Sequence, residues 1–281
     1  MSRRHAYVGE RAPPAAEYHD CDFDFKEHEK EMQPLLNALN QQAPAASPVI
    51  SGLEWDEFYK AHTRARFFKE RRYLLLEFPM LAVAQPPQHI VELGCGCGSA
   101  ILPVLRANPT ASATVCDISP TCITQLQDAA VSAGIGDRLR AFSANAADPC
   151  LQEALSHLQA NACLIMFTLS AVLPYEMLGM LRNAYAALAP GGVFLIRDHG
   201  LYDMVQMRMK AENRLDSNLY RLADGTISYF FSTEDLAAKC NSVGFDTLEC
   251  KYVTVHSTNR KKGLTLKRVF VHGVFQKPLA A

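Results

Sequence analysis

The pattern of apolar and polar positions changes at about residue 86. Beyond it, short apolar runs alternate with longer amphipathic stretches, a rhythm typical of parallel strands connected by helices. The strands are expected at residues 89–93, 112–117, 139–144, 162–169 and 192–198. This alternation predicts a doubly wound α/β fold, in which helices cover both faces of the sheet.

The C-terminal part of the chain predicts one more helix and a pair of strands. Residues 233–243 have a helical pattern that ends at Gly244, and glycine readily takes the positive φ of a helix C-cap. Residues 250–256 and 264–276 alternate on either side of the turn sequence NRKKG (259–263). We expect them to form an antiparallel hairpin at the sheet edge.

The first 85 residues do not follow the βα rhythm. Residues 1–51 predict a partly flexible extension, with an acidic, helical arm at 25–39 and a Pro/Ala/Ser-rich connector at 41–51. Residues 52–85 are basic and aromatic and predict one or two helices. The remaining 196 residues, 86–281, form the predicted α/β domain.

Composition indicates a folded, unsecreted protein. The 281 residues are 49% hydrophobic and 20% charged, and no apolar run approaches the roughly 20 residues that span a bilayer. The N-terminus has no secretory signal, so we expect no membrane association and a cytoplasmic or nuclear location, with a mitochondrial one left open by Arg3, Arg4 and Arg11. The nine cysteines lack the spacing of a zinc site, so no metal is predicted.

The segment HIVELGCGCG (89–98) predicts a nucleoside-binding site. An apolar strand runs into three alternating glycines, which let a ligand approach the backbone, and Asp117 ends the next strand, where a carboxylate can accept hydrogen bonds from ribose. A tight turn and a helix-capping aspartate would explain either piece alone. The G-x-G-x-G spacing differs from the dinucleotide loop G-x-G-x-x-G and, with Glu92, resembles motif I of class I methyltransferases.

Further blocks narrow the resemblance. They are WDEFY (55–59), FFKER (67–71), EFP (77–79), FTLSA (167–171), PGG (190–192), RDHGLYD (197–203), DGT (224–226) and YFFS (229–232). Together with motif I, and in unbroken order over residues 52–276, these blocks resemble the tRNA (cytosine-N3) methyltransferase family. Glycine loops are common, whereas the RDHGLYD and DGT…YFFS blocks are much more specific.

This resemblance implies a seven-stranded class I methyltransferase (Rossmann-like) sheet with an N-terminal helical extension. It also implies methyl transfer from S-adenosylmethionine to N3 of a cytidine in a tRNA anticodon loop, usually position 32. Family members can rely on a partner such as seryl-tRNA synthetase to choose the tRNA. The cofactor contacts implied at matching positions are Trp55, Tyr59, Gly94, Gly96, Asp117, Asn145, Ala146 and Met166.

The chain departs from the family pattern at two of these blocks. Asn145 and Ala146 stand where the family usually has Asp-Leu, so the expected hydrogen bond to adenine loses its charge assistance and weaker cofactor binding is predicted. His199 replaces the aromatic residue of R-D-Y-G. We expect His199, like His62 and His256, to be structural.

The candidate catalytic residues follow the fifth predicted strand. Cytosine N3 carries an in-plane lone pair, so no proton needs to be removed before it attacks the methyl group, and the product ring is cationic. Asp198, at the carboxyl end of a strand, is the candidate carboxylate near that charge, with Arg197 binding phosphate or holding Asp198. The alternative for Asp198 is an aspartate that caps a helix or pairs with an arginine.

Positive charge is concentrated in two places despite a net charge of −1. Residues 60–72 carry six basic and one acidic group, and Phe67, Phe68, Lys69 and Arg71 are the candidate RNA contacts, combining phosphate binding with base stacking. Residues 257–277 carry six basic groups and form a second candidate patch. Without the family resemblance, both would be read as solvated surfaces.

Three other functions compete with this interpretation. A small-molecule methyltransferase would share motif I but would not need the basic, aromatic segment. An inactive adaptor that binds S-adenosylmethionine is suggested by Asn145. A nicotinamide-dependent oxidoreductase is disfavoured by the glycine spacing.

Overall fold

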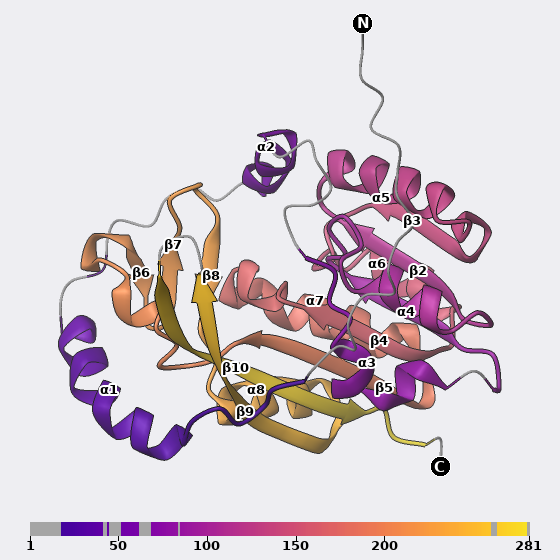
Figure 1. The fold of residues 1–281 in the computed structure, drawn as a ribbon. Helices are drawn as coiled ribbons and strands as arrows, with labels where there is room; N and C mark the ends of the chain where they lie inside the picture. The colour runs from indigo at the N-terminus through magenta and orange to yellow at the C-terminus, as the bar shows by residue number, and fades with distance from the viewer. Residues whose placement is uncertain are drawn as a thin grey trace, which may run out of the picture.

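The computed structural model describes residues 18–41, 44, 52–61, 69–83, 85–259 and 263–279. Its centre is a seven-stranded sheet with the order β3-β2-β1-β4-β5-β10-β9, which confirms the predicted fold (Figure 1). The strands are β1 (His89–Leu93), β2 (Ser112–Asp117), β3 (Leu139–Ser143), β4 (Ala160–Met166), β5 (Leu188–His199), β9 (Asp246–Asn259) and β10 (Leu264–Gln276). Strands β1 to β5 pair in parallel, and β10 is antiparallel to both of its neighbours.

Each face of the sheet buries its own apolar cluster. Side chains alternate between faces along a strand, so Ile90 packs with α4 and α5 while Val91 packs with α7 on the opposite face. The helices after the strands are α4 (Ile101–Ala107), α5 (Pro120–Ser132), α6 (Leu151–Ser156), α7 (Pro174–Ala187) and α8 (Thr233–Val243). Helix α8 has the predicted bounds, and Gly244 caps it with φ of 109°.

The strands β3, β4, β5 and β9 each begin or end one to four residues away from the prediction, and two of these differences have identifiable reasons. Strand β4 ends at Met166 instead of residue 169, because Phe167 takes a left-handed conformation with φ of 58°. Strand β5 begins at Leu188 instead of residue 192, ahead of Pro190-Gly191-Gly192. A register shift against β4 accommodates these three residues, and such irregularities are where proline and glycine are tolerated in strands.

The described residues between 52 and 85 form short helices whose apolar side chains join the cluster on one face of the sheet. They are α2 (Leu53–Ala61), α3 (Leu74–Glu77) and the 3-10 helix η1 (Pro79–Ala82). Leu74, Phe78 and Leu81 are fully buried in the same cluster as α4 and α5. Among the described residues, no helix is long and apolar enough to cross a membrane.

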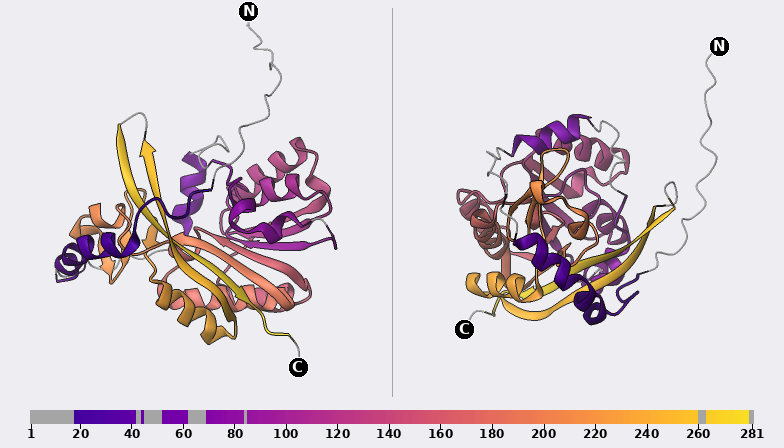
Figure 2. Two further views of the ribbon diagram at one scale, coloured as in Figure 1. Left: turned by 60° about the horizontal axis from the view of Figure 1, so that its bottom comes forward. Right: turned by 90° about the vertical axis from the view of Figure 1, so that its left-hand side faces the viewer.

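The N-terminal arm packs along β9, the outermost strand of the sheet. Backbone hydrogen bonds join Asp22 N to Thr254 O (2.9 Å) and Thr254 N to Asp20 O (3.0 Å). Helix α1 (Phe25–Asn40) follows, with Phe25 stacked on Tyr252 at a centroid distance of 3.8 Å. The described part of the extension is therefore packed against the sheet, beside the long β9–β10 hairpin that extends past the body of the protein (Figure 2).

A small second sheet was not foreseen from the sequence. It contains β6 (Arg214–Asp216), β7 (Leu219–Arg221) and β8 (Ile227–Tyr229), all antiparallel. Three-residue strands are too short to show a recognisable alternation. The turn between β7 and β8 carries the DGT block and comes close to α2, since a Cβ at Gly225 would lie 3.7 Å from Glu54 Cγ.

Candidate functional site

The candidate site is a pocket of about 630 Å³ at the carboxyl ends of β1, β2 and β4. The strand order reverses between β1 and β4, and open α/β sheets bind their ligands at such a switch point. Helix α2 and the β7–β8 turn border the pocket on the side away from the sheet. Its volume lies within the range of roughly 300–1,000 Å³ that is usual for small-molecule sites.

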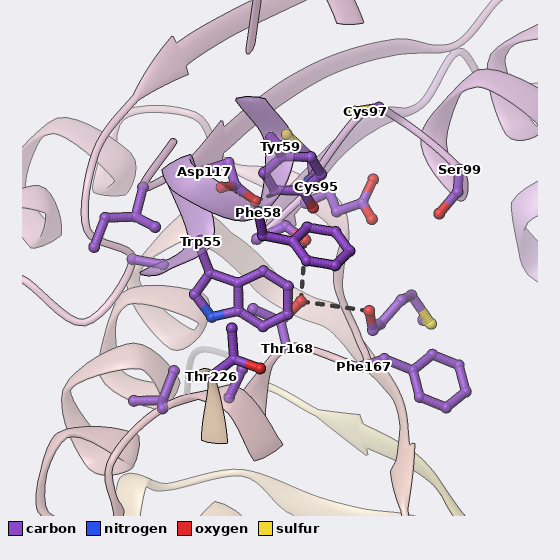
Figure 3. A pocket seen from close by; sticks show the side chains of 18 of the residues that line it. Trp55, Phe58, Tyr59, Cys95, Cys97, Ser99, Asp117, Phe167, Thr168 and Thr226 are labelled. Carbon is purple, nitrogen blue, oxygen red and sulfur yellow. Dashed lines mark hydrogen bonds between the residues drawn. The ribbon is translucent and has the colours of Figure 1, made fainter. Parts of the chain in front are cut away.

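The glycine turn after β1 lines one end of the pocket. Gly94, Gly96 and Gly98 all have positive φ, between 49° and 81°. A Cβ at Gly94 would lie 2.0 Å from Thr168 Cγ2, and one at Gly96 would lie 2.6 Å from Tyr59 Oη. Neighbouring side chains therefore reach the glycine backbone itself, and Thr168 fixes the turn by donating its hydroxyl to Gly94 O at 3.0 Å (Figure 3).

Asp117 connects β2 to the glycine turn. Its two carboxylate oxygens accept the backbone N–H groups of Gly96 (2.9 Å) and Ser119 (3.0 Å). The side chain lines the pocket but is more enclosed than expected for an exposed strand end, because only 8% of the residue is accessible. Burial raises the pKa of this carboxyl above its ordinary value.

Helix α2 contributes the aromatic wall of the pocket. Trp55, Phe58 and Tyr59 gather near Asp117, with ring centroids 5.5–6.2 Å apart (Figure 3). The helix is attached to the start of α5 by Asp56, which accepts the Ser119 hydroxyl at 2.6 Å. That hydrogen bond is the main reason why the pKa of Asp56 is lowered.

Asn145, Ala146 and Met166 complete the side of the pocket that the resemblance assigns to the cofactor. Asn145 Oδ1 accepts the backbone N–H of Ala147 at 3.0 Å, an Asx turn that sets the direction of the amide. All eight residues predicted to bind the cofactor thus line one pocket. Their roles in binding stay predictions.

Glu92 is an acidic group enclosed beneath the same end of the pocket. It is 2% exposed, and burial raises the pKa of its carboxyl to about 8. Its Oε2 atom has no hydrogen-bond partner among the described residues. A polar ligand group in the pocket would satisfy that atom.

The other end of the pocket is aromatic and cationic. Phe167 holds a left-handed conformation that is rare for a bulky residue, and such strain is concentrated at functional sites. The Arg71 guanidinium lies 4.4 Å from the centroid of the Phe167 ring and donates to Met166 O at 3.1 Å. Phe270 packs edge-on against Phe167 at 5.4 Å, and Arg268 lies over Phe270 at 5.0 Å.

Asp203, from the RDHGLYD block, explains how Arg268 is held at this end. The single Nε–H of Arg268 is shared between the two carboxylate oxygens of Asp203, at 3.0 and 2.8 Å, and Val269 N donates to the same carboxylate at 2.9 Å. Asp203 is fully buried. The motif therefore supports a cation that lines the pocket.

The two predicted catalytic residues do not line the pocket. Asp198 is fully buried, and its oxygens accept the backbone N–H groups of Ser170 (3.0 Å) and His199 (2.8 Å). Arg197 Nη1 donates to Glu77 at 2.8 Å on the side of α3, so the EFP and RDHGLYD blocks meet in a buried ion pair. Arg197 is paired with Glu77, and the roles of Asp198 and Arg197 in the reaction stay predictions.

The predicted RNA contacts are found in different environments. Lys69 is exposed, whereas Arg71 is half-buried and lines the pocket. Phe67 and Phe68 lie outside the described residues, as do residues 260–262 of the second patch. His199, expected to be structural, lines the pocket.

Several residues that line the pocket were missed from the sequence: Phe58, Thr168, Asp224, Thr226 and Phe270. Asp224 and Thr226 belong to a block that carried the resemblance, and Asp224 accepts the Thr226 hydroxyl at 2.7 Å. That hydrogen bond shapes the β7–β8 turn. The DGT block had no role assigned to it in the sequence, and its presence among the family blocks was the signal that could have placed Asp224 and Thr226 at the site.

The pocket fits S-adenosylmethionine in its chemistry. The glycine turn lines the pocket, Asp117 offers a carboxylate at the end of β2, α2 supplies flat apolar rings, and Glu92 has an unpartnered oxygen. These groups would hold the sugar, the adenine and the amino-acid portion of the cofactor. Among the described residues, no three metal-ligating side chains gather in one place.

The fold and the pocket together define a class I S-adenosylmethionine-dependent methyltransferase. The family model described as "Methyltransferase domain" matches residues 59–250. The structure also resembles a SAM-dependent methyltransferase from Anabaena variabilis, with a TM-score of 0.64 and 11% sequence identity over 84% of this chain and 99% of that one.

Two curated relatives narrow the class further. Human tRNA N(3)-cytidine methyltransferase METTL6 is 34% identical over 228 residues, which are 80% of this chain and 79% of that protein. O-methyltransferase 3 from Dictyostelium discoideum is 36% identical over 193 residues, 68% of this chain but 44% of that protein. The chain belongs to the methyltransferase-domain family and, within it, to the family of the tRNA N(3)-cytidine methyltransferases.

Proposed function

We propose that this protein transfers the methyl group of S-adenosylmethionine to N3 of a cytidine in tRNA. The observation that carries the proposal is a single pocket with two chemically distinct ends. One end has the glycine turn and Asp117, and the other has Phe167 and Phe270 with Arg71 and Arg268. The first suits a nucleoside cofactor, and the second suits a flat base attached to a phosphate backbone.

The reaction requires alignment more than acid–base chemistry. The cofactor supplies an electrophilic methyl group, and N3 attacks with a lone pair that is already available. Phe167 and Phe270 offer faces and edges for the base, and Arg71 and Arg268 lie over these rings, where they can bind a phosphate. Holding two reactants in line accounts for a large part of catalysis in such reactions.

Asp198 fits a positioning role in this scheme. It binds the backbone of Ser170, in the loop after Phe167, and of His199, at the end of β5. The carboxylate therefore fixes the two chain segments that carry pocket residues. Burial raises its pKa to about 6, so it is ionised above that pH and its field stabilises a nearby cationic product ring.

The human relative supports a cytidine in tRNA as the substrate, and the family resemblance supports its position. We propose the anticodon loop of tRNA, at position 32, since unpaired loops allow a base to enter a protein pocket. Lys69 is an exposed cation two residues from Arg71 and is suited to a phosphate contact. A protein partner such as seryl-tRNA synthetase would select the tRNA, and the cytoplasm is the proposed location.

Nucleoside mass spectrometry tests the proposal. The purified protein is incubated with S-adenosylmethionine and tRNA carrying cytidine or uridine at position 32, with and without seryl-tRNA synthetase. We expect 3-methylcytidine only in the cytidine tRNA, and none with Asp117→Asn as the matched control. A modified uridine tRNA, or no 3-methylcytidine under any condition, would refute the proposal.

The main alternative is methylation of a small molecule, which the similarity to O-methyltransferase 3 favours. Transfer of a radiolabelled methyl group distinguishes the two functions when total tRNA and a metabolite extract are compared. Label in the extract alone would establish the alternative. No label in either, combined with cofactor binding by calorimetry, would indicate an adaptor.

A further inference from the structure

His199 occupies an unusual place in the aromatic end of the pocket. It is the last residue of β5, and its ring is surrounded by Phe167, Phe230 and Phe270 at centroid distances of 5.4, 5.6 and 6.2 Å. The aromatic residue usual in R-D-Y-G would complete a fully carbon-lined wall with a hydroxyl at its rim. Histidine instead puts two nitrogens within the ring itself.

The imidazole is held in its neutral form. Burial, together with the positive charges of Arg268 and Arg71, lowers the pKa of His199 to about 3. The neighbouring carboxylate of Asp198 accepts a hydrogen bond from the backbone N–H of His199 and not from its imidazole ring. A neutral imidazole carries one N–H donor and one bare nitrogen, so the position of the proton decides what the ring can bind.

The surroundings of the two nitrogens assign that proton. Nδ1 is sealed from solvent and has no hydrogen-bond partner among the described residues. The same combination of burial and missing partner is not found for Nε2. A buried N–H without an acceptor is rarer and more costly than a buried lone pair without a donor. We therefore assign the proton to Nε2, on a histidine that lines the pocket.

We propose that His199 positions the target cytosine by donating its Nε2–H to the exocyclic oxygen O2 of the base. This inference rests on the proposed function. Two groups flank N3 of cytosine: O2 accepts hydrogen bonds, and the amino group at C4 donates them. A donor beside N3 can therefore select only O2, which leaves the N3 lone pair free to point at the methyl group.

Neutrality also matters for the product of the reaction. The methylated ring is cationic, so a protonated histidine at this place would oppose the charge that develops during transfer. A neutral donor holds O2 without that repulsion. Burial, with the charges of Arg268 and Arg71 as smaller contributions, keeps His199 neutral and thus makes it a usable ligand for the base.

Three variants separate a hydrogen bond from a packing role. His199→Gln puts an amide nitrogen near the place of Nε2, His199→Asn puts one near the place of Nδ1, and His199→Phe keeps a ring without a donor. Each is assayed on an RNA hairpin with cytidine and on one with 2-thiocytidine, whose sulfur is a weak acceptor. Thermal unfolding and calorimetry with S-adenosylmethionine check fold and cofactor binding.

The wild-type protein should methylate the 2-thiocytidine RNA about 3- to 10-fold less efficiently than the cytidine RNA, as expected for one hydrogen bond. His199→Phe should be slower on cytidine and show no such difference. His199→Gln should recover activity and His199→Asn should not.

An equal effect of sulfur in the wild type and in His199→Phe, or rescue by asparagine alone, would overturn the assignment. Loss of all activity in His199→Gln, with cofactor binding intact, would also overturn it. A wild-type protein that binds the cofactor and methylates neither RNA would refute the proposed function, and the inference with it. These two failures are therefore distinguishable.

Discussion

Replacing Arg197 by methionine tests whether this residue supports the fold or contacts a substrate. Glu77 binds Arg197 Nη1 through Oε2 at 2.8 Å and His272 Nδ1 through Oε1 at 2.9 Å. The side chain of Glu77 is fully buried, and that of Arg197 is 5% exposed. Methionine leaves the carboxylate buried without its main counter-charge, a change that typically costs about 3–5 kcal/mol of folding free energy.

The assay is urea unfolding followed by circular dichroism, with cofactor affinity measured on the same samples. The double variant Glu77→Gln/Arg197→Met is the matched control, because it removes both charges together. We expect it to be more stable than Arg197→Met alone, with a coupling of about 1–3 kcal/mol between the two sites. Normal stability of Arg197→Met with loss of methyl transfer would refute the structural role and favour a substrate contact.

Three further predictions concern the pocket and its surroundings. Asp117→Ala should weaken cofactor binding about tenfold or more, the worth of one charge-assisted hydrogen bond, and unchanged affinity in calorimetry would exclude a binding role. Lys69→Ala should lower the slope of log tRNA affinity against log salt by about 1 and leave cofactor binding unchanged. Arg71→Ala should weaken the binding of tRNA and of the cofactor. Identical effects of the two variants would contradict the different environments of the two residues. Burial raises the pKa of Glu92 to about 8 from an ordinary value of 4.5, so its protonated form stabilises the folded protein at low pH and this contribution disappears as pH rises through 8. Between pH 4.5 and 8 the wild type should lose stability relative to Glu92→Gln, and parallel unfolding curves across that range would show that Glu92 does not titrate there.

The sheet could be predicted because its strands are buried on both faces and read as continuous apolar runs. Strands β1 and β2 have the predicted bounds for this reason. The ends of β4 and the start of β5 depend on Phe167 and on a register shift at residues 190–192, which are tertiary effects. The β6–β8 sheet was missed because its strands are three residues long.

The residues of the site likewise fall into those that a local sequence pattern could place and those whose position depends on partners far away in the sequence. Pocket residues that belong to a linear motif, such as Gly94 and Asp117, could be placed because strand, turn and strand follow each other in sequence. Arg197 could not, because its partner Glu77 is 120 residues away and a buried ion pair leaves no local pattern. The position of His199 in the pocket lining was not expected, because a histidine within a motif does not reveal which groups enclose it.

The N-terminal arm also determines how this protein can be shortened. Residues 20–22 occupy hydrogen-bonding groups of Thr254 on β9, a strand at the edge of the large sheet. A form that starts at the methyltransferase blocks, near residue 52, would free the Thr254 backbone groups on this edge strand and also expose the ring of Tyr252, on which Phe25 now stacks. Open edges next to apolar surface pair with strands from other molecules, so we expect the arm to reduce self-association of the protein.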